Sequence, residues 1–151
     1  MIVLLDSGPL GMLTNPKPTP LNLECRLWMR KLLLKGYRVI LPEIADYEVR
    51  RELIRANRLV GIQRLDEWKE ELEYSPLTTE TMLKAAEFWA ESRQAGKPTA
   101  SPDALDGDVI LAAQAYLIAE EGVDRTTVII ATTNVEHLAR FAIAKYWQDI
   151  N

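Results

Sequence analysis

The chain has 151 residues, of which 48% are hydrophobic and 26% charged, and this suits a single domain (1–151) with its own core. Its net charge of −4 argues against a protein that holds nucleic acid by bulk electrostatics, but it leaves room for a local basic patch. One cysteine, Cys25, excludes an intrachain disulfide, and the absence of a signal-peptide pattern or a membrane-spanning apolar run leads us to expect a cytoplasmic protein.

From the N-terminus, short apolar runs alternate with stretches of helical periodicity. "IVLL" predicts a buried strand that ends at Asp6, before the turn-forming "SGP". Gly36 is the C-cap signal that closes the first expected helix. In chain order the sequence predicts a strand at 2–5, a loop at 16–20, a helix at 21–36, a strand at 37–42, and a helix at 43–59 with Ile44, Tyr47, Leu53 and Ile54 near one face.

The middle of the chain, roughly 43–104, has an almost purely helical pattern, and we expect it to form one layer or a lid. Thr78 or Thr79 is the expected N-cap of the helix predicted within 75–96. The sequence predicts helices at 60–74 and 75–96, a loop at 97–104, a helix at 105–122, a strand at 127–132, a helix within 134–141 and a short strand at 146–150. Short apolar strands that alternate with helices indicate an α/β fold with a parallel sheet covered on both faces.

Polar side chains stand where the predicted strands end. Asp6 follows the first strand and Asn134 follows "IIATT". Ligands of a parallel sheet bind at the carboxyl ends of its strands, an edge also reached by Glu48 in the next helix and by Asp108 at the expected start of another. Three carboxylates and an amide oxygen form a hard site suited to Mg²⁺ or Mn²⁺. Without a cation, close carboxylates would repel one another, so these residues either form a metal site or do not cluster.

Each of these residues also has a simpler interpretation. Asp6 would cap the turn after the first strand, and Glu48 would belong to a solvated, salt-bridged helix face. Asp108 would complement the partial positive charge at a helix start, and Asn134 would cap the helix that follows it. Taken jointly, the four positions favour a site over coincidence.

Further residues are candidates for auxiliary roles. Asp103 and Asp106 are spare acids that would assist the site, with Asp106 as a proton acceptor away from the metal. Thr133 is either a plain strand-end residue or a hydroxyl that orients a ligand or a bound water. His137, the only histidine, cannot form a zinc site because the chain offers no Cys/His ligand set, and a substrate contact is its functional alternative.

Basic and aromatic residues suggest contacts with partners. Arg51 and Arg55 lie in "RRELIRANR", where surface salt bridges with Glu48 and Glu52 are the simpler interpretation and contact with RNA phosphates is the functional one. The four tryptophans are interpreted as packing or interface residues. Exposed apolar helix surface around Trp68, Leu72 and the "EFWAE" stretch leads us to expect a homodimer or a higher assembly.

Four segments, in order along nearly the whole chain, carry a family resemblance: "LDSGPL", "PEIADYEVRREL", "DVILAAQA" and "IIATTN". The sharpest pattern among them is D-x-x-(I/L)-A-A-x-A, which begins at Asp108. With these segments the sequence resembles the PIN-domain family, the small nuclease fold of the VapC-type toxins and their relatives. The resemblance implies a three-layer α/β/α fold with a central, mainly parallel sheet of four to five short strands.

The resemblance also implies an Mg²⁺- or Mn²⁺-dependent endoribonuclease, with Asp6, Glu48 and Asp108 as catalytic metal ligands. Asn134 stands where many members have a fourth Asp, and because an amide binds Mg²⁺ more weakly than a carboxylate does, the number of metal ions stays open. The implied partners are an RNA substrate and, if the protein is a toxin, a cognate antitoxin.

Hydrolysis of RNA phosphodiester bonds is therefore the function that the sequence favours, with a metal-activated water as the nucleophile. A catalytically weak or inactive PIN-fold binding or regulatory module is the alternative, and Asn134 in place of an acid favours it. A receiver domain or a haloacid-type phosphatase fits poorly, because position 8 is glycine and the second expected strand ends in Pro42.

Overall fold

Five strands form one sheet in the order β3-β2-β1-β4-β5, and every neighbouring pair is parallel. The computed structural model describes residues 1–96, 102–122 and 127–151, without the side chains of 102–104. The central strand β1 aligns Leu4 with Ile40 on one side and with Ile130 on the other. The strands are β1 Ile2–Leu5, β2 Arg38–Pro42, β3 Glu73–Ser75, β4 Val128–Thr132 and β5 Ala144–Tyr146.

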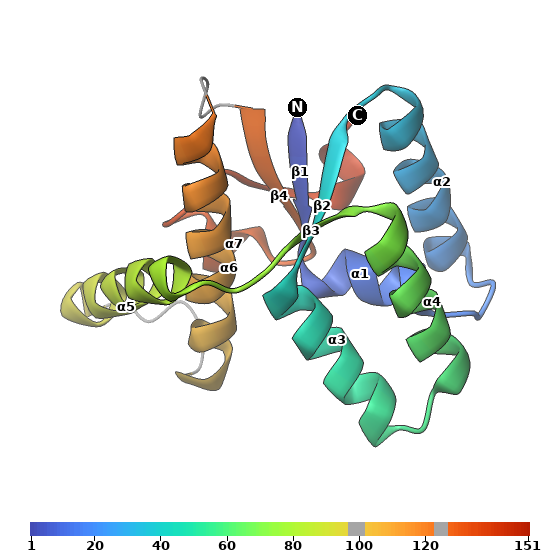
Figure 1. Cartoon of the computed structure of the whole chain (residues 1–151), viewed down its shortest axis with the longest axis horizontal. Helices are drawn as coiled ribbons and strands as arrows, with labels where there is room; N and C mark the ends of the chain where they lie inside the picture. Colours follow the sequence, from blue (N-terminus) through green and yellow to red (C-terminus); the bar gives the residue numbers. More distant parts are fainter. Residues whose placement is uncertain (97–101, 123–126) are drawn as a thin grey trace.

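Helices cover both faces of this sheet (Figure 1). They are α1 Ser7–Thr14, α2 Pro20–Leu34, α3 Glu43–Arg55, α4 Leu59–Glu71, α5 Thr79–Gln94, α6 Pro102–Glu121 and α7 Val135–Leu138, with a 3₁₀ turn, η2, at Trp147–Asp149. Thr78 caps α5 by accepting a hydrogen bond from the Thr81 N–H. In the described parts of the chain, no helix combines the length and apolarity that a membrane crossing requires.

The two faces of the strands build two separate cores. Val3 and Leu5 point into a core shared with Leu10 of α1, Met29 of α2 and Leu65 of α4. The intervening strand residues point the other way. The buried members of that second core are Leu4, Ile40, Ile44, Leu111, Ala115, Val128, Ile130 and Leu138. The three-layer α/β/α fold expected from the sequence is therefore confirmed, with alternate strand residues serving opposite layers.

Residues 43–104 do not form a single layer or lid, so that expectation is wrong. Leu65 of α4 belongs to the core under α1 and α2, whereas Phe88 of α5 packs against α6 on the other side of the sheet. Between these helices runs β3, which the sequence pattern assigned to a helix. A three-residue edge strand carries no buried apolar run, and its conformation comes from pairing with β2.

Helix α1 was not predicted from the sequence, and helix α6 begins earlier than predicted. The "SGP" stretch, expected to be a turn, opens α1, because Pro9 falls in the first turn, where a missing N–H costs nothing. Helix α6 begins at Pro102, so the expected loop is wrong for residues 102–104, and its remainder, 97–101, lies outside the described residues. At the C-terminus the strand is Ala144–Tyr146, not 146–150.

Surface and core assignments of some apolar residues also change. On α3, Ile44 is buried and Leu53 packs against the core, as predicted, but Tyr47 and Ile54 are 56% and 57% exposed, so the predicted face is wrong for these two. Ala45 and Val49 complete the buried face. Leu72 is buried and Trp68 is partly buried, so neither supports the predicted dimer surface, although Trp89 is exposed. Trp28 and Trp147 pack edge to face in the core, as expected of packing residues. Homodimer formation stays a prediction.

Candidate active site

Asp6 occupies the carboxyl end of β1 and is held there by two hydrogen bonds. Its Oδ1 accepts the N–H of Ser7 at 2.7 Å and its Oδ2 accepts the hydroxyl of Thr132 at 2.7 Å. The register of β1 and β4 pairs Leu5 with Ala131, which places Asp6 beside Thr132. Asp6 therefore caps α1, as the simpler interpretation held, and also presents its carboxylate at the edge of the sheet.

The hydroxyl that orients Asp6 belongs to Thr132 and not to Thr133. Thr132 is fully buried and makes this bond, whereas Thr133 is exposed and lies over Gly8. Thr132 ends the predicted strand at 127–132, but no role was predicted for it. An alignment of the ends of β1 and β4 would have indicated this role. Leu5 pairs with Ala131, so the residues that follow them, Asp6 and Thr132, lie side by side.

Asp108 lies inside α6 and not at its start, so the helix-start interpretation of this residue is wrong. Its carboxylate is largely buried, and burial, followed by the charge of Asp6, raises its pKa to about 6 against the opposing effect of His137. The pKa of Glu48 is also raised, first by burial and then by Asp6 and, to a smaller extent, Asp108, against Arg51. The three acids expected to converge thus lie close enough to influence one another.

Asn134 is linked to the three acids by His137, which lies between its side chain and Asp108. Its Nδ2 lies 2.9 Å from Nδ1 of His137, and the same Nδ1 is 3.5 Å from Oδ2 of Asp108. Asn134 occupies the N-cap position of α7, but its side chain makes no capping bond, and its backbone N–H donates to Thr132 Oγ1 instead. His137 was given only a minor role from the sequence, although its i+3 spacing from Asn134 places both on one side of a helical turn.

Asp106 and Arg55 lie outside this group. Asp106 is exposed, and its charge is not among those that shift the pKa of Glu48 or Asp108. Asp103 falls in the first turn of α6, and its side chain is outside the described residues. Arg55 forms the expected surface ion pair with Glu52 at 2.9 Å.

A groove of about 880 Å³ leads away from the acids. It starts at Ser7 and Glu48 and runs along α3 toward the turn before α4, where Arg58 lies. Arg51 and Arg55 line the groove, and the Arg51 guanidinium stacks 5.0 Å from the ring centroid of Tyr47. The basic patch that the net charge left room for is therefore a rim beside the acids.

The acids fit a hydrated, hard divalent cation better than an all-protein metal cage. Within the described ranges, no three Asp, Glu, His or Cys side chains lie close enough to enclose a metal ion. However, Oδ2 of Asp108 is buried and makes no hydrogen bond with any residue that the structure describes. A buried, unpartnered carboxylate oxygen beside other acids is unfavourable unless a cation or a proton joins it. Mg²⁺ keeps several of its waters when carboxylates bind it, so wide acid spacing suits it.

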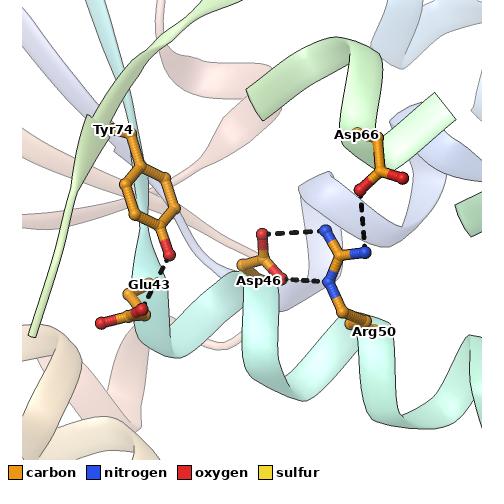
Figure 2. Close-up of polar contacts among 5 residues, drawn as sticks. All are labelled: Glu43, Asp46, Arg50, Asp66 and Tyr74. Carbon is orange, nitrogen blue, oxygen red and sulfur yellow. Dashed lines mark hydrogen bonds and ion pairs between the residues drawn. The ribbon is translucent and has the colours of Figure 1, made fainter. Parts of the chain in front are cut away.

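Helix α3, which carries Glu48, is fixed to its neighbours by a polar network (Figure 2). Arg50 bonds both carboxylate oxygens of Asp46, at 2.7 and 3.2 Å, and reaches Asp66 of α4 at 2.8 Å. At the start of the helix, Tyr74 of β3 donates its hydroxyl proton to Glu43 at 2.9 Å. The network holds α3 against both α4 and β3, so Glu48 stands on an anchored helix.

Replacing Arg50 by alanine should lower the free energy of unfolding by about 2–3 kcal/mol at pH 7, because Asp46, with only 7% of its side chain exposed, would lose its cation. The loss should fall below that of a fully buried pair, since Arg50 is itself 27% exposed. Urea denaturation measures it. Arg55→Ala removes an exposed pair of the same helix and should leave the midpoint unchanged. Equal effects of the two substitutions would contradict the anchoring role of Arg50.

Comparisons with known proteins agree with this geometry. No protein-family model matches the sequence, and no curated protein matches it. Solved structures do. VapBC2 from Rickettsia felis, bound to a DNA fragment from its promoter, matches with a TM-score of 0.70 at 17% identity over 97% of this chain and 99% of that one. The chain has a PIN-domain fold of the VapC type.

Two further structures show the same PIN-domain fold. FitAcB from Neisseria gonorrhoeae has a TM-score of 0.69 at 18% identity over 98% of this chain and 99% of that chain. VapBC-1 from nontypeable Haemophilus influenzae has a TM-score of 0.68 at 16% identity over 99% and 100%. The resemblance seen in four sequence segments is thereby confirmed for the fold of the whole chain.

Proposed function

We propose that the protein is a metal-dependent endoribonuclease whose active site is the acid group at the carboxyl edge of the sheet. The observation that carries the proposal is Asp108: its buried Oδ2 makes no hydrogen bond with the described residues, with His137 Nδ1 at 3.5 Å, and the charge of Asp6 at the end of β1 acts on it. The buried oxygen of Asp108 does not serve folding, because a buried carboxylate oxygen without a hydrogen bond destabilises the protein. A bound cation would account for the buried oxygen.

Asp6, Glu48 and Asp108 would hold Mg²⁺ or Mn²⁺, with Asn134 as the fourth ligand. When bound, such an ion lowers the pKa of a coordinated water toward neutrality and offsets the charge of the phosphate oxygens. Thr132 orients the Asp6 carboxylate by donating to its Oδ2, and His137 engages the amide nitrogen of Asn134, which leaves the amide oxygen as the acceptor. The protein residues thus supply preformed orientation.

The partners follow from the same proposal. RNA is the substrate, and the groove beside Glu48 gives it a path lined by Arg51 and Arg55. A cognate antitoxin belongs to the proposal because the resemblance to VapC-type toxins implies one, and because VapBC2 has the same fold. Homodimer formation and a cytoplasmic location complete it.

A non-catalytic binding module is the second candidate function. The observation that favours it is the lack, among the residues that the structure describes, of three side chains close enough to enclose a metal ion. Such a module would use the groove for a partner and would bind metal weakly. It differs from the nuclease in one measurable respect, the dependence of RNA cleavage on Mn²⁺.

The test is cleavage of a mixed-sequence single-stranded RNA by the purified protein. We expect cleavage with Mn²⁺ or Mg²⁺, none with a chelator, and none from the Asp6→Asn protein, because the substitution removes a charged ligand while the amide can still cap α1. Separation of the products on a denaturing gel measures it. Intact RNA with the wild-type protein and Mn²⁺ would support the binding module, and equal cleavage with chelator would exclude the metal.

The basic rim gives a separate prediction on RNA affinity. In an Asp108→Asn background, which should bind RNA without cutting it, Arg51→Ala and Arg55→Ala should each weaken binding. Each should also reduce the slope of log affinity against log salt by about 0.7, the value per phosphate contact of a single strand. Fluorescence anisotropy over a salt series measures it. Arg30→Ala, an exposed arginine on α2, is the control. An unchanged salt slope in both rim variants would remove these arginines from the RNA path.

A further inference from the structure

Gly107, directly before Asp108, lies under the carboxylate of Glu48. A Cβ atom at this position would stand 2.9 Å from Oε2 of Glu48 and 3.3 Å from its Oε1 and Cδ. The first of these distances is shorter than real Cβ contacts allow. The end of the Glu48 side chain, which comes from α3, therefore rests against the backbone of α6 at the one place where α6 has no side chain.

No other feature of the described residues requires glycine at position 107. Gly107 lies inside α6, and it is not among the described glycines with positive φ, which are Gly36 and Gly96. Glycine is the least favourable residue of a helix interior apart from proline, because it loses the most backbone freedom on folding. The same helix uses alanine for its close contacts, as at the fully buried Ala112 and Ala113. The space that a side chain at position 107 would fill is therefore occupied by the Glu48 carboxylate.

We propose that Gly107 is a positioning residue of the active site: its missing side chain lets the Glu48 carboxylate lie against α6 beside Asp108, and so sets the spacing of the two acids. The inference rests on the proposed function, since it concerns the same site. A methyl group at position 107 would displace Glu48 outward. Because the displaced atoms are the far end of a flexible side chain, this displacement would disturb the metal site and not the fold.

The experiment compares Mn²⁺ binding of the wild type and Gly107→Ala, by calorimetric titration and by thermal melts with chelator and with Mn²⁺. Without metal, Gly107→Ala should melt no lower than the wild type, because alanine favours the helix. Its dissociation constant for Mn²⁺ should rise about tenfold, since a displaced ligand loses most of its interaction. At a Mn²⁺ concentration a hundredfold above the wild-type constant, its gain in melting temperature should be about half that of the wild type.

Two controls separate this effect from a general one. Gly11→Ala is the matched substitution, since Gly11 lies in α1 and a Cβ there would meet nothing within 4 Å, so its response to Mn²⁺ should equal that of the wild type. In a Glu48→Asp background the shorter side chain does not reach the methyl group, so adding Gly107→Ala should change the Mn²⁺ constant less than about twofold. If Gly107→Ala alone does not fold, the double variant should fold, because it removes the clash.

The outcomes are distinct. Equal Mn²⁺ binding by the wild type and Gly107→Ala would overturn the role of Gly107 and leave the nuclease proposal standing. A tenfold loss that persists in the Glu48→Asp background would also overturn it, because the effect would not pass through Glu48. So would failure of both Gly107→Ala proteins to fold. No response of the wild type to Mn²⁺ would overturn the metal site itself, and this inference with it.

Discussion

Asp108→Asn should reduce Mn²⁺-dependent RNA cleavage to the level seen with chelator, while the far-ultraviolet circular dichroism spectrum stays native. The substitution keeps the size of the side chain and removes the charge that a hard cation needs. The fold should survive, because Oδ2 of Asp108 makes no hydrogen bond to the described residues that the amide would break. Gel-based cleavage of a labelled RNA, together with the spectrum, measures both effects.

Asp106→Asn is the matched control for this prediction. It makes the same chemical change two positions away on the same helix, at an exposed site whose charge is not among those that shift the pKa of Glu48 or Asp108. Cleavage by Asp106→Asn should equal that of the wild type. Full activity of Asp108→Asn would remove it from the catalytic site, and equal losses in both variants would point to a general effect of charge on RNA binding.

The positions of the central elements were predictable because local patterns determine them. The apolar runs of β1, β2 and β4 are buried on both faces, and such strands show as continuous apolar stretches. Because parallel strands end at the same edge, the placement of Asp6 and Asn134 near one another followed from the strands alone. Gly36, with φ of 79°, closed α2 as its sequence signal indicated.

What the sequence did not predict depends on contacts between distant segments. Strand β3 forms because Tyr74 and its neighbours pair with β2, and its three residues carry no pattern of their own. The ion pair of Arg50 with Asp66 joins α3 to α4, and no local pattern specifies it. The role of Thr132 depends on the register of β1 against β4, which no local pattern specifies.

The grouping of the candidate acids was predictable from the sequence only in part, and their role as metal ligands stays a proposal. The convergence of Asp6, Glu48 and Asp108 was expected from strand ends and helix starts, yet Asp108 reaches the site from the interior of a helix that begins earlier. The link from Asn134 through His137 to Asp108 depends on a single turn of α7 packed against α6. Side-chain directions of this kind follow from tertiary packing and not from residue spacing.

The second large effect concerns stability in the absence of metal, which tests the site without any substrate. Asp108 has an ordinary pKa of 3.8, and in the folded protein burial and Asp6 raise it to about 6. Between these values the folded state holds more protons than the unfolded state. Stability must therefore fall as pH rises from about 4 to about 6 and stay reduced above that range. The loss amounts to about 3 kcal/mol, at 1.36 kcal/mol for each pKa unit.

In chelator at pH 7 to 8, Asp108→Asn should therefore melt higher than the wild type by roughly 6–12 °C, taking about 2–4 °C for each kcal/mol in a protein of this size. At pH 4, where Asp108 is protonated in the folded state and about half protonated in the unfolded state, the two proteins should melt much closer together. With Mn²⁺ at a hundredfold excess over its dissociation constant, the wild type should gain about 2.7 kcal/mol and the variant little. Calorimetric melts over pH 4 to 8 measure all three results. A variant that is less stable than the wild type in chelator, or that gains as much from Mn²⁺, would show that the Asp108 charge stabilises the fold and is not a metal ligand.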